Sequence, residues 1–165
     1  MRTHLLVQST LLLRQVLEQS TITTDVSLLL PNMPSIRPVE FSWRQRTLVR
    51  IPYFWADDIE MERSAPCWHL APLLAVDKGL KVLAFHPIHI YLNAATVQPY
   101  QALKDRVPKL SEATPDILKA YVHTGDGVCV LFRELIEHLA ASGQSPCIQD
   151  ISTRWTDTIG GMDAQ

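Results

Sequence analysis

The longest regular pattern of hydrophobic positions lies near the carboxyl terminus, between two glycine-containing breaks. Its apolar residues recur at helical spacing, which predicts a helix over Val128–Ala141 that Gly143 ends. A second helix is predicted over Gln8–Gln19, where Ser9 or Thr10 can cap the first turn. Shorter helices are predicted over Val97–Val107 and Pro115–His123. The apolar stripe of the longest helix consists of Val128, Leu131, Phe132, Leu135, Ile136 and Leu139.

Three short apolar runs have the length and flanking residues of strands: Asp25–Leu30, Thr47–Ile51 and Lys81–Phe85. The third is entered through Gly79 and must end at His86, because Pro87 forces extended geometry on the residue before it and cannot donate to a sheet. The pattern therefore predicts an α/β layered fold whose third strand is buried.

The predicted elements do not make a complete sheet. Three strands cannot close a barrel, and a strand buried on both faces needs neighbours on both edges. We expect one partial domain over residues 1–150, followed by a frayed polar tail over residues 151–165. An exposed sheet edge would make the chain prone to self-association.

Several polar side chains gather where the third strand ends. His86 is followed by His89, Tyr91 and Asn93, and in α/β proteins the chemistry collects at the carboxyl ends of parallel strands. An imidazole at this position can carry a proton near neutral pH. The alternative for His86 is a structural residue held by hydrogen bonds. His89 and Asn93 could fix the loop that follows the strand, or contact substrate at the rim of the site.

Composition excludes several classes of protein. The formal charge of −2 and the lack of a basic stripe argue against nucleic acid as a partner. No apolar run approaches the roughly 20 residues of a membrane span, and no signal peptide is apparent. The three cysteines, Cys67, Cys129 and Cys147, have no metal-ligand spacing, which favours free thiols in a reducing cytoplasm.

Four motifs, taken in order, resemble a known family. Arg2-Thr-His, Asp25-Val-Ser27, the block from Ile51 to Asp58 and the block from Phe85 to Asn93 are similar to the carboxyl-terminal half of polysaccharide deacetylases of the NodB-homology superfamily, particularly its WbmS-like branch. The similarity covers residues 1–142. It implies the later strands and helices of an irregular seven-stranded (β/α) barrel, and hydrolysis of acetyl groups on a carbohydrate substrate.

The resemblance also implies roles for individual residues. His86 matches the late-strand histidine that protonates the leaving group, and Arg2 matches the arginine that orients the catalytic base. Arg50 is a rival for that arginine, since Arg50-Ile-Pro-Tyr53 spells the family's Arg-x-Pro-Tyr signature. We rank it second because it stands too close to the late histidine motif.

The residues that follow the second predicted strand, Thr47–Ile51, are candidates for substrate contact. Aromatic rings suit stacking on a sugar, although the same rings could be barrel core, which we favour for Phe54. The adjacent acids could form a carboxylate pair with one raised pKa, or a solvated turn. The candidate substrate-binding residues are Tyr53, Trp55, Asp57, Asp58, His89 and Asn93.

The family holds a divalent metal, zinc or similar, with one aspartate and two histidines from motifs that precede the arginine. Only Met1 precedes Arg2 in this chain. On a straight strand, His86 and His89 would point to opposite faces and could not replace these ligands. We therefore expect that this chain binds no metal and is a truncated form lacking the metal-binding half.

Two functions follow from these patterns. The first is a metal-dependent polysaccharide deacetylase-like hydrolase, with His86 and Arg2 as catalytic residues. The second is a catalytically inactive remnant that binds sugar or associates with itself through the exposed sheet edge.

Overall fold

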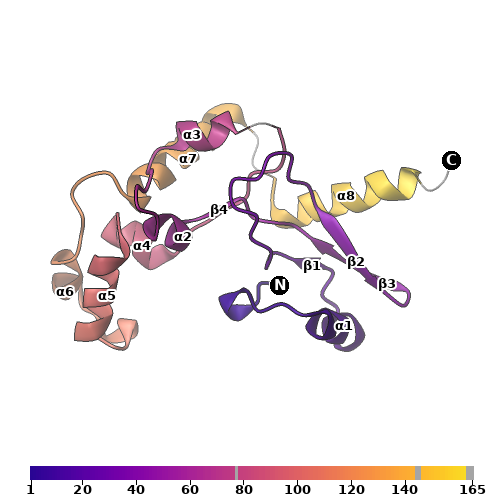
Figure 1. Ribbon diagram of the computed structural model, residues 1–165, viewed down its shortest axis with the longest axis horizontal. Coiled ribbons are helices and arrows are strands. Elements are labelled where there is room, and N and C mark those ends of the chain that lie inside the picture. The colour runs from indigo at the N-terminus through magenta and orange to yellow at the C-terminus, as the bar shows by residue number, and fades with distance from the viewer. Residues whose placement is uncertain (77, 144–145, 163–165) are drawn as a thin grey trace. The chain divides into compact units, whose positions relative to one another are not determined.

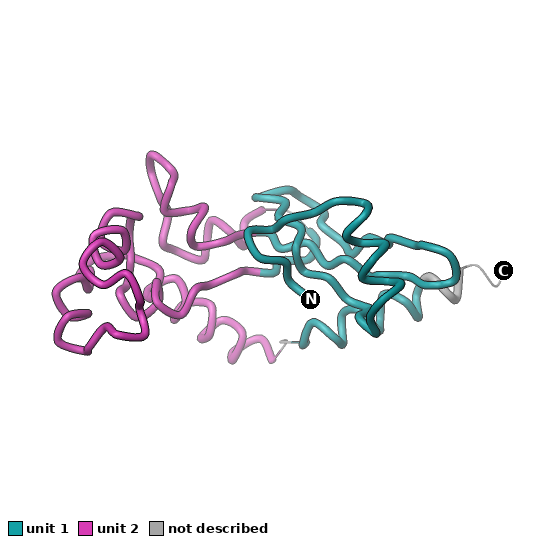
Figure 2. The backbone as a smooth tube through the Cα atoms, turned by 90° about the horizontal axis from the view of Figure 1, so that it is seen from below, with its two compact units in different colours: residues 1–54, 77–82, 145–165 teal, residues 55–76, 83–144 magenta. Residues whose placement is uncertain are grey.

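The computed structural model describes residues 1–76, 78–143 and 146–162. The chain forms two compact units (Figure 2). Unit 1 combines residues 1–54 and 78–82 with the carboxyl-terminal segment from residue 146, and unit 2 combines residues 55–76 with residues 83–143. The chain therefore crosses between the two units more than once.

Unit 1 is built on a three-stranded mixed sheet of order β1-β3-β2 (Figure 1). β1 runs parallel to β3, with Thr24 opposite Val49, whereas β2 and β3 form an antiparallel hairpin. Its elements are η1, a 3-10 turn at His4–Leu6, α1 (Thr10–Gln19), β1 (Thr24–Asp25), β2 (Val39–Trp43), β3 (Arg46–Arg50) and α8 (Ile148–Met162).

Alternation along β3 directs its side chains to two faces of this sheet. Leu48 is fully buried and packs with Leu13 and Leu17 of α1. Its neighbours Thr47 and Val49 point to the other face, where they line a cavity together with residues of α8. α1 begins as its sequence predicts, because the Ser9 hydroxyl accepts a hydrogen bond from the Leu12 amide at 3.1 Å.

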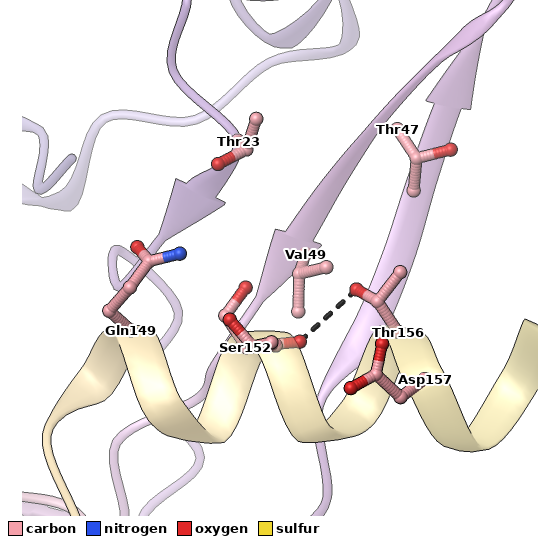
Figure 3. Close-up of a pocket in the computed structure, with 8 residues that line it drawn as sticks. Thr23, Thr47, Val49, Gln149, Ser152, Thr156 and Asp157 are labelled. Carbon is pink, nitrogen blue, oxygen red and sulfur yellow. Dashed lines mark hydrogen bonds between the residues drawn. The ribbon is translucent and has the colours of Figure 1, made fainter.

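A cavity of about 290 Å³ lies between the sheet of unit 1 and α8 (Figure 3). Most of its lining residues are threonine or serine, and the Thr24 hydroxyl donates to the Ser152 hydroxyl at 2.9 Å beside it. The Thr156 hydroxyl forms a hydrogen bond within the helix, donating to the Ser152 carbonyl at 3.1 Å. The lining residues are Thr23, Thr47, Val49, Gln149, Ser152, Thr153, Thr156 and Asp157.

Unit 2 is mostly helical and contains one two-stranded parallel sheet, β4-β5. Its strands are β4 (Trp55–Ala56) and β5 (Leu83–Ala84). Its helices are α2 (Asp57–Met61), α3 (Leu70–Ala75), α4 (Pro87–Leu92), α5 (Val97–Arg106), η2 (a 3-10 turn at Leu110–Glu112), α6 (Pro115–Lys119) and α7 (Val128–Ser142).

Aromatic rings form much of the interior of unit 2. Trp55 lies 6.2 Å from Trp68 and 5.2 Å from Phe85, and Phe85 lies 5.2 Å from Phe132 of α7, all measured between ring centroids. The Trp68 indole donates to the Ala95 carbonyl at 3.2 Å, which satisfies its polar edge in a buried place. This cluster joins both strands of unit 2 to its longest helix.

The helices were predicted better than the strands. α1, α5 and α7 confirm the helical periodicity, and α7 ends at Gly143, whose φ of 62° is left-handed. The stripe of α7 is only partly buried, since Val128 and Leu131 are fully buried and Ile136 is 49% exposed. The predicted frayed tail is wrong for residues 151–162, which belong to α8, and residues 163–165 lie outside the described residues.

The strands are shorter than predicted. The run over residues 25–30 yields only β1 and a single bridge between Leu29 and Tyr53, and the run over residues 81–85 yields only half-buried β5. β2 was missed because Val39–Trp43 follows a proline-rich loop and has no clear alternation. The described residues form a mixed α/β structure without a closed barrel. None of their helices combines the length and apolar character that spanning a membrane requires.

We expect self-association through β2, which lies at one edge of the three-stranded sheet. Val39 on this strand is 42% exposed, and an open edge offers unpaired backbone groups to another chain. Val39→Lys should lower the apparent mass of the chain in light scattering, whereas Ile59→Lys, at a 40% exposed site on α2, should not. A wild-type chain that is monomeric at every concentration would contradict this expectation.

Candidate functional site

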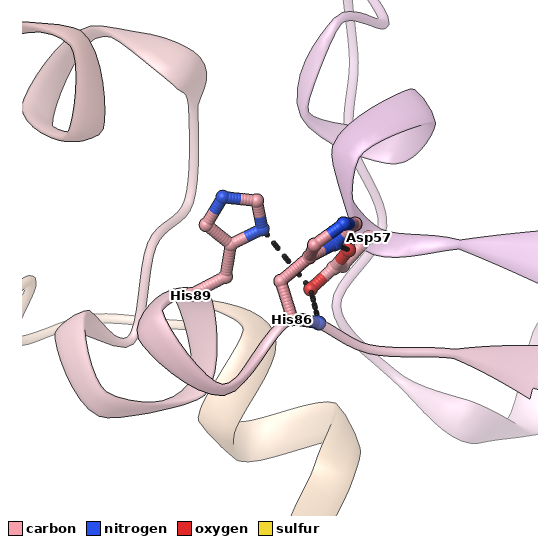
Figure 4. A group of neighbouring side chains, drawn as sticks. All are labelled: Asp57, His86 and His89. Atoms are coloured by element: carbon pink, nitrogen blue, oxygen red, sulfur yellow. Dashed lines mark hydrogen bonds and ion pairs between the residues drawn. The ribbon is translucent and has the colours of Figure 1, made fainter. Parts of the chain in front are cut away.

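Two parallel strands of unit 2 deliver an aspartate and a histidine to the same edge. β4 and β5 pair with Trp55 opposite Leu83 and Ala56 opposite Ala84. Asp57 follows β4 directly and begins α2, while His86 follows β5 by two residues and precedes α4. Because parallel strands end on the same side of their sheet, these side chains meet (Figure 4).

The carboxylate of Asp57 is fully buried and surrounded by nitrogen donors. Its Oδ1 lies 2.8 Å from the Asp58 amide and 2.6 Å from Nδ1 of His86. Its Oδ2 lies 2.7 Å from the His86 amide and 3.1 Å from Nδ1 of His89. Four donors match the four lone-pair directions of a carboxylate, so every acceptor position of Asp57 is used.

Burial by itself raises the pKa of Asp57, because it removes water from the charged form. The hydrogen bonds from His89 and His86 outweigh burial, and the pKa of Asp57 lies below its ordinary value of 3.8. Asp57 is therefore ionised at neutral pH. An ionised carboxylate only accepts hydrogen bonds, so both imidazoles donate to it through Nδ1–H.

The two histidines differ in exposure. The His86 side chain is 40% exposed, whereas that of His89 is 5% exposed. The Nδ1 bond of His86 leaves Nε2, across the ring, as the atom that a substrate can reach. The His89 ring packs against Tyr100 of α5 in a T-shaped arrangement, with the centroids 4.8 Å apart. His86 is thus the exposed member of the cluster and His89 a buried one.

The structure corrects the geometric reason for separating His86 from His89. The chain does not continue as a strand beyond His86, since Pro87 takes the first position of α4. Proline suits a helix start because its missing N–H would have no helical partner there. His86 caps this helix and His89 lies one turn along, so residues three apart share one side. Asp57, His86 and His89 offer ligand-type atoms all within 4.8 Å of one another.

Trp55 and Tyr53 do not form the predicted substrate-facing surface. Each is 3% exposed, Trp55 in unit 2 and Tyr53 in unit 1. The Trp55 indole donates at 3.1 Å to Glu60, a buried carboxylate that also accepts from the Cys67 amide at 2.8 Å. Phe54 is 1% exposed, as the core interpretation predicts.

The two acids at the end of β4 have different surroundings. Asp57 is no open substrate contact, because its oxygens are fully occupied by nitrogen donors. Asp58 is half-buried and accepts from the Ile59 amide at 2.9 Å, which places it in the first turn of α2. Of the two acids, Asp58 is therefore the one that a substrate can contact.

Asn93 has a structural role in unit 2. It adopts the left-handed conformation that ends α4, with φ of 45°. Its amide nitrogen donates to the Gly125 carbonyl at 2.7 Å, and its side-chain oxygen accepts from the Cys129 amide at 3.0 Å. A Cβ on Gly127 would lie 2.2 Å from the Asn93 carbonyl oxygen, so only glycine fits there. Asn93 therefore fixes the loop that starts α7.

The two candidate arginines both belong to unit 1. The Arg2 guanidinium lies over the Tyr53 ring, 5.2 Å from its centroid. Arg50 forms an ion pair with Asp25, which is fully buried, at 2.9 Å. The backbone amide of Ser27 donates to the other oxygen of Asp25 at 3.1 Å. Arg50 is thus part of an ion pair with a buried carboxylate, whereas Arg2 contacts an aromatic ring.

Tyr100 and Glu60 were not singled out from the sequence, and neither lies in a motif that marks it. Asp57 was named, but as a substrate contact. Its position directly after one apolar run, with His86 directly after another, is the signal that predicts their meeting, provided that the two strands are neighbours.

Comparison with known proteins gives one family and one solved structure. The family described as WbmS-like polysaccharide deacetylase matches residues 1–104, which include Asp57, His86 and His89. A crystal structure from Bordetella bronchiseptica matches with a TM-score of 0.60 and 27% sequence identity. It is described as a candidate polysaccharide deacetylase involved in O-antigen biosynthesis, WbmS.

The match covers 83% of this chain and 54% of the Bordetella chain, so this chain spans about half the length of that protein. No curated protein gives a match.

Proposed function

This chain belongs to the WbmS-like polysaccharide deacetylase family, and on that premise we propose that it removes acetyl groups from a carbohydrate by hydrolysis, with His86 as the proton donor. The observation that carries this proposal is the hydrogen bond of 2.6 Å between the buried carboxylate of Asp57 and Nδ1 of His86. A carboxylate in this position fixes the tautomer and orientation of an imidazole, which acid–base catalysis requires.

The proposed reaction adds water to the acetyl carbonyl carbon. This water loses one proton to the solvent, from which His86 is reprotonated for the next turnover. The bond between that carbon and the sugar nitrogen or oxygen then breaks, and acetate and the deacetylated sugar are released. The proton carried by Nε2 of His86 passes to the departing nitrogen or oxygen, which would otherwise leave as a poor, strongly basic group. The Asp57 carboxylate, ionised and buried, stabilises the positive charge that His86 carries before this transfer.

The family implies a divalent ion, which would polarise the carbonyl and activate water. The cluster of Asp57, His86 and His89 has suitable donor types, with all ligand-type atoms within 4.8 Å. It does not fit that ion, because each Asp57 oxygen already accepts two N–H groups, one of them from the backbone. We propose that this cluster carries protons and binds no metal, and we derive no step through an ion.

Two further residues have proposed roles. Arg2 is proposed as the arginine that orients the catalytic base, and Asp58 as a contact for the sugar. The whole chain is proposed as the later part of a (β/α) barrel. Its three cysteines are unpaired, which supports a reducing compartment such as the cytoplasm.

The test is acetate release from N-acetylated and O-acetylated oligosaccharides, assayed with and without added Zn²⁺. We expect acetate release above the rate without protein. A chain that binds the oligosaccharide but releases no acetate under either condition would overturn the catalytic proposal. That outcome would support the alternative, a remnant that binds sugar without hydrolysing it. The chain spans 54% of the Bordetella protein, which is compatible with such a remnant.

A further inference from the structure

His89 is a second imidazole on the carboxylate that holds His86. Its Nδ1 lies 3.1 Å from Oδ2 of Asp57, whereas Nδ1 of His86 lies 2.6 Å from Oδ1. The two rings therefore engage different oxygens of one carboxylate, and their centroids are 4.9 Å apart. If His86 acts as the acid, its contact with Asp57 is sufficient to orient it. The presence of His89 on the same carboxylate therefore needs a separate explanation.

The surroundings of His89 limit what it can do. Its side chain is 5% exposed, and its ring packs against Tyr100. Among the hydrogen bonds of the described residues, its ring has one, to Asp57. It is too enclosed to meet a sugar, so the predicted role in substrate binding does not suit its position. Apart from this packing, replacing His89 acts on the cluster through Asp57.

The burial of Asp57 makes that hydrogen bond consequential. Asp57 is fully buried, and a buried charge is costly unless donors compensate it. Hydrogen bonding by His89 lowers the pKa of Asp57 against the opposing effect of burial. The charged groups on the neighbouring elements include Asp58 and Glu60 of α2. Glu60 pairs with Arg63 at 3.4 Å, and Nζ of Lys104 on α5 lies 4.8 Å from the centroid of Tyr100.

We infer that His89 is a positioning residue, which keeps Asp57 ionised and aligned so that Asp57 holds His86 with Nδ1 protonated and Nε2 toward the substrate. This inference rests on the proposed function for its catalytic consequence. Its structural part, a hydrogen bond from His89 Nδ1–H to an ionised Asp57, can be tested without any activity.

The first test uses the wild-type chain. Nitrogen-15 NMR distinguishes protonated from unprotonated ring nitrogens, and we expect Nδ1 of His89 to carry a proton from about pH 6 to about pH 8, the range in which a free imidazole changes charge. An unprotonated Nδ1 in this range would overturn the inference, because His89 could not then donate to Asp57.

The second test compares two replacements that keep the approximate size of the side chain. His89→Phe removes the donor, while His89→Asn places an amide N–H near the former Nδ1. His138→Asn, at an exposed site on α7, is the matched control. By carbon-13 NMR of the Asp57 carboxyl, His89→Phe should move its titration to higher pH, and His89→Asn should restore much of the wild-type value. Equal titration in wild type and His89→Phe would contradict the inference.

The third test separates this inference from the proposed function. In the acetate assay, His89→Phe should lower kcat by about tenfold with KM little changed, as expected for a group that acts through the acid, and His89→Asn should recover part of the loss. If the wild type releases no acetate, the proposed function fails while both NMR tests still decide the role of His89. One Zn²⁺ bound per wild-type chain and lost in His89→Asn would overturn the inference, because the imidazoles would then be ligands.

Discussion

His86→Gln should lower the rate of acetate release from an acetylated sugar by about 100-fold or more, the size of contribution that a positioned acid makes. Glutamine approximates the reach of the imidazole but has no proton to give near neutral pH. His86 is the exposed member of the cluster, with a side chain 40% exposed and its Nδ1 fixed 2.6 Å from Asp57. The loss should therefore fall on kcat, with KM changed little.

A second substrate separates loss of the acid from loss of the fold. 4-Nitrophenyl acetate has a leaving group that departs without being protonated, so its hydrolysis should fall far less in His86→Gln than that of the acetylated sugar. His138→Gln, at an exposed site, should leave both rates unchanged. Equal losses on both substrates would show that His86 does not protonate the leaving group.

The second large effect is on stability, at Asp57. We expect Asp57→Asn to lower the free energy of unfolding by about 3–5 kcal/mol, the cost of breaking a buried charge cluster on one side. Asparagine has nearly the same shape, so no cavity forms. Its NH₂ group must, however, face one of two oxygen positions that each meet two N–H donors. Urea unfolding followed by circular dichroism measures the difference.

Asp58→Asn is the matched control for this change. Asp58 is the adjacent residue of the same helix, is half-buried, and accepts a hydrogen bond from the Ile59 amide that asparagine can also accept. Its replacement should cost less than about 1 kcal/mol. Similar losses for the two variants would contradict the claim that the four donors around Asp57 make it special.

The pH dependence of stability follows from the same carboxylate. The pKa of Asp57 is lower in the folded chain than its ordinary value of 3.8. Its ionised form therefore stabilises the fold above about pH 4, and this contribution is lost as the pH falls through the lower folded pKa. In unfolding measurements at successive pH values, Asp57→Asn should flatten this acid-side loss.

How far the sequence predicts this protein can be judged from individual elements. The periodicity of α7 and the cap at Ser9 were correctly identified, because a helix depends on residues three and four apart along the chain. β2 was not identified, because a strand without alternation becomes visible only through its partner, here β3. The family was also identified from the sequence, since its motifs stand in order along residues 1–104.

The site shows the same division. The order of residues was enough to establish that Asp57 and His86 each follow an apolar run, and that Pro87 ends the strand by His86. The strand was expected to end at His86, but strand geometry was still applied to His89. Because a proline can also begin a helix, the two histidines were wrongly placed on opposite faces. The parallel pairing of β4 with β5, and the burial of Asp57 between two imidazoles, became known only from the folded structure. Those contacts join residues 29 and 32 positions apart, and local propensity carries no information about such pairings because their energy comes from strand pairing and burial.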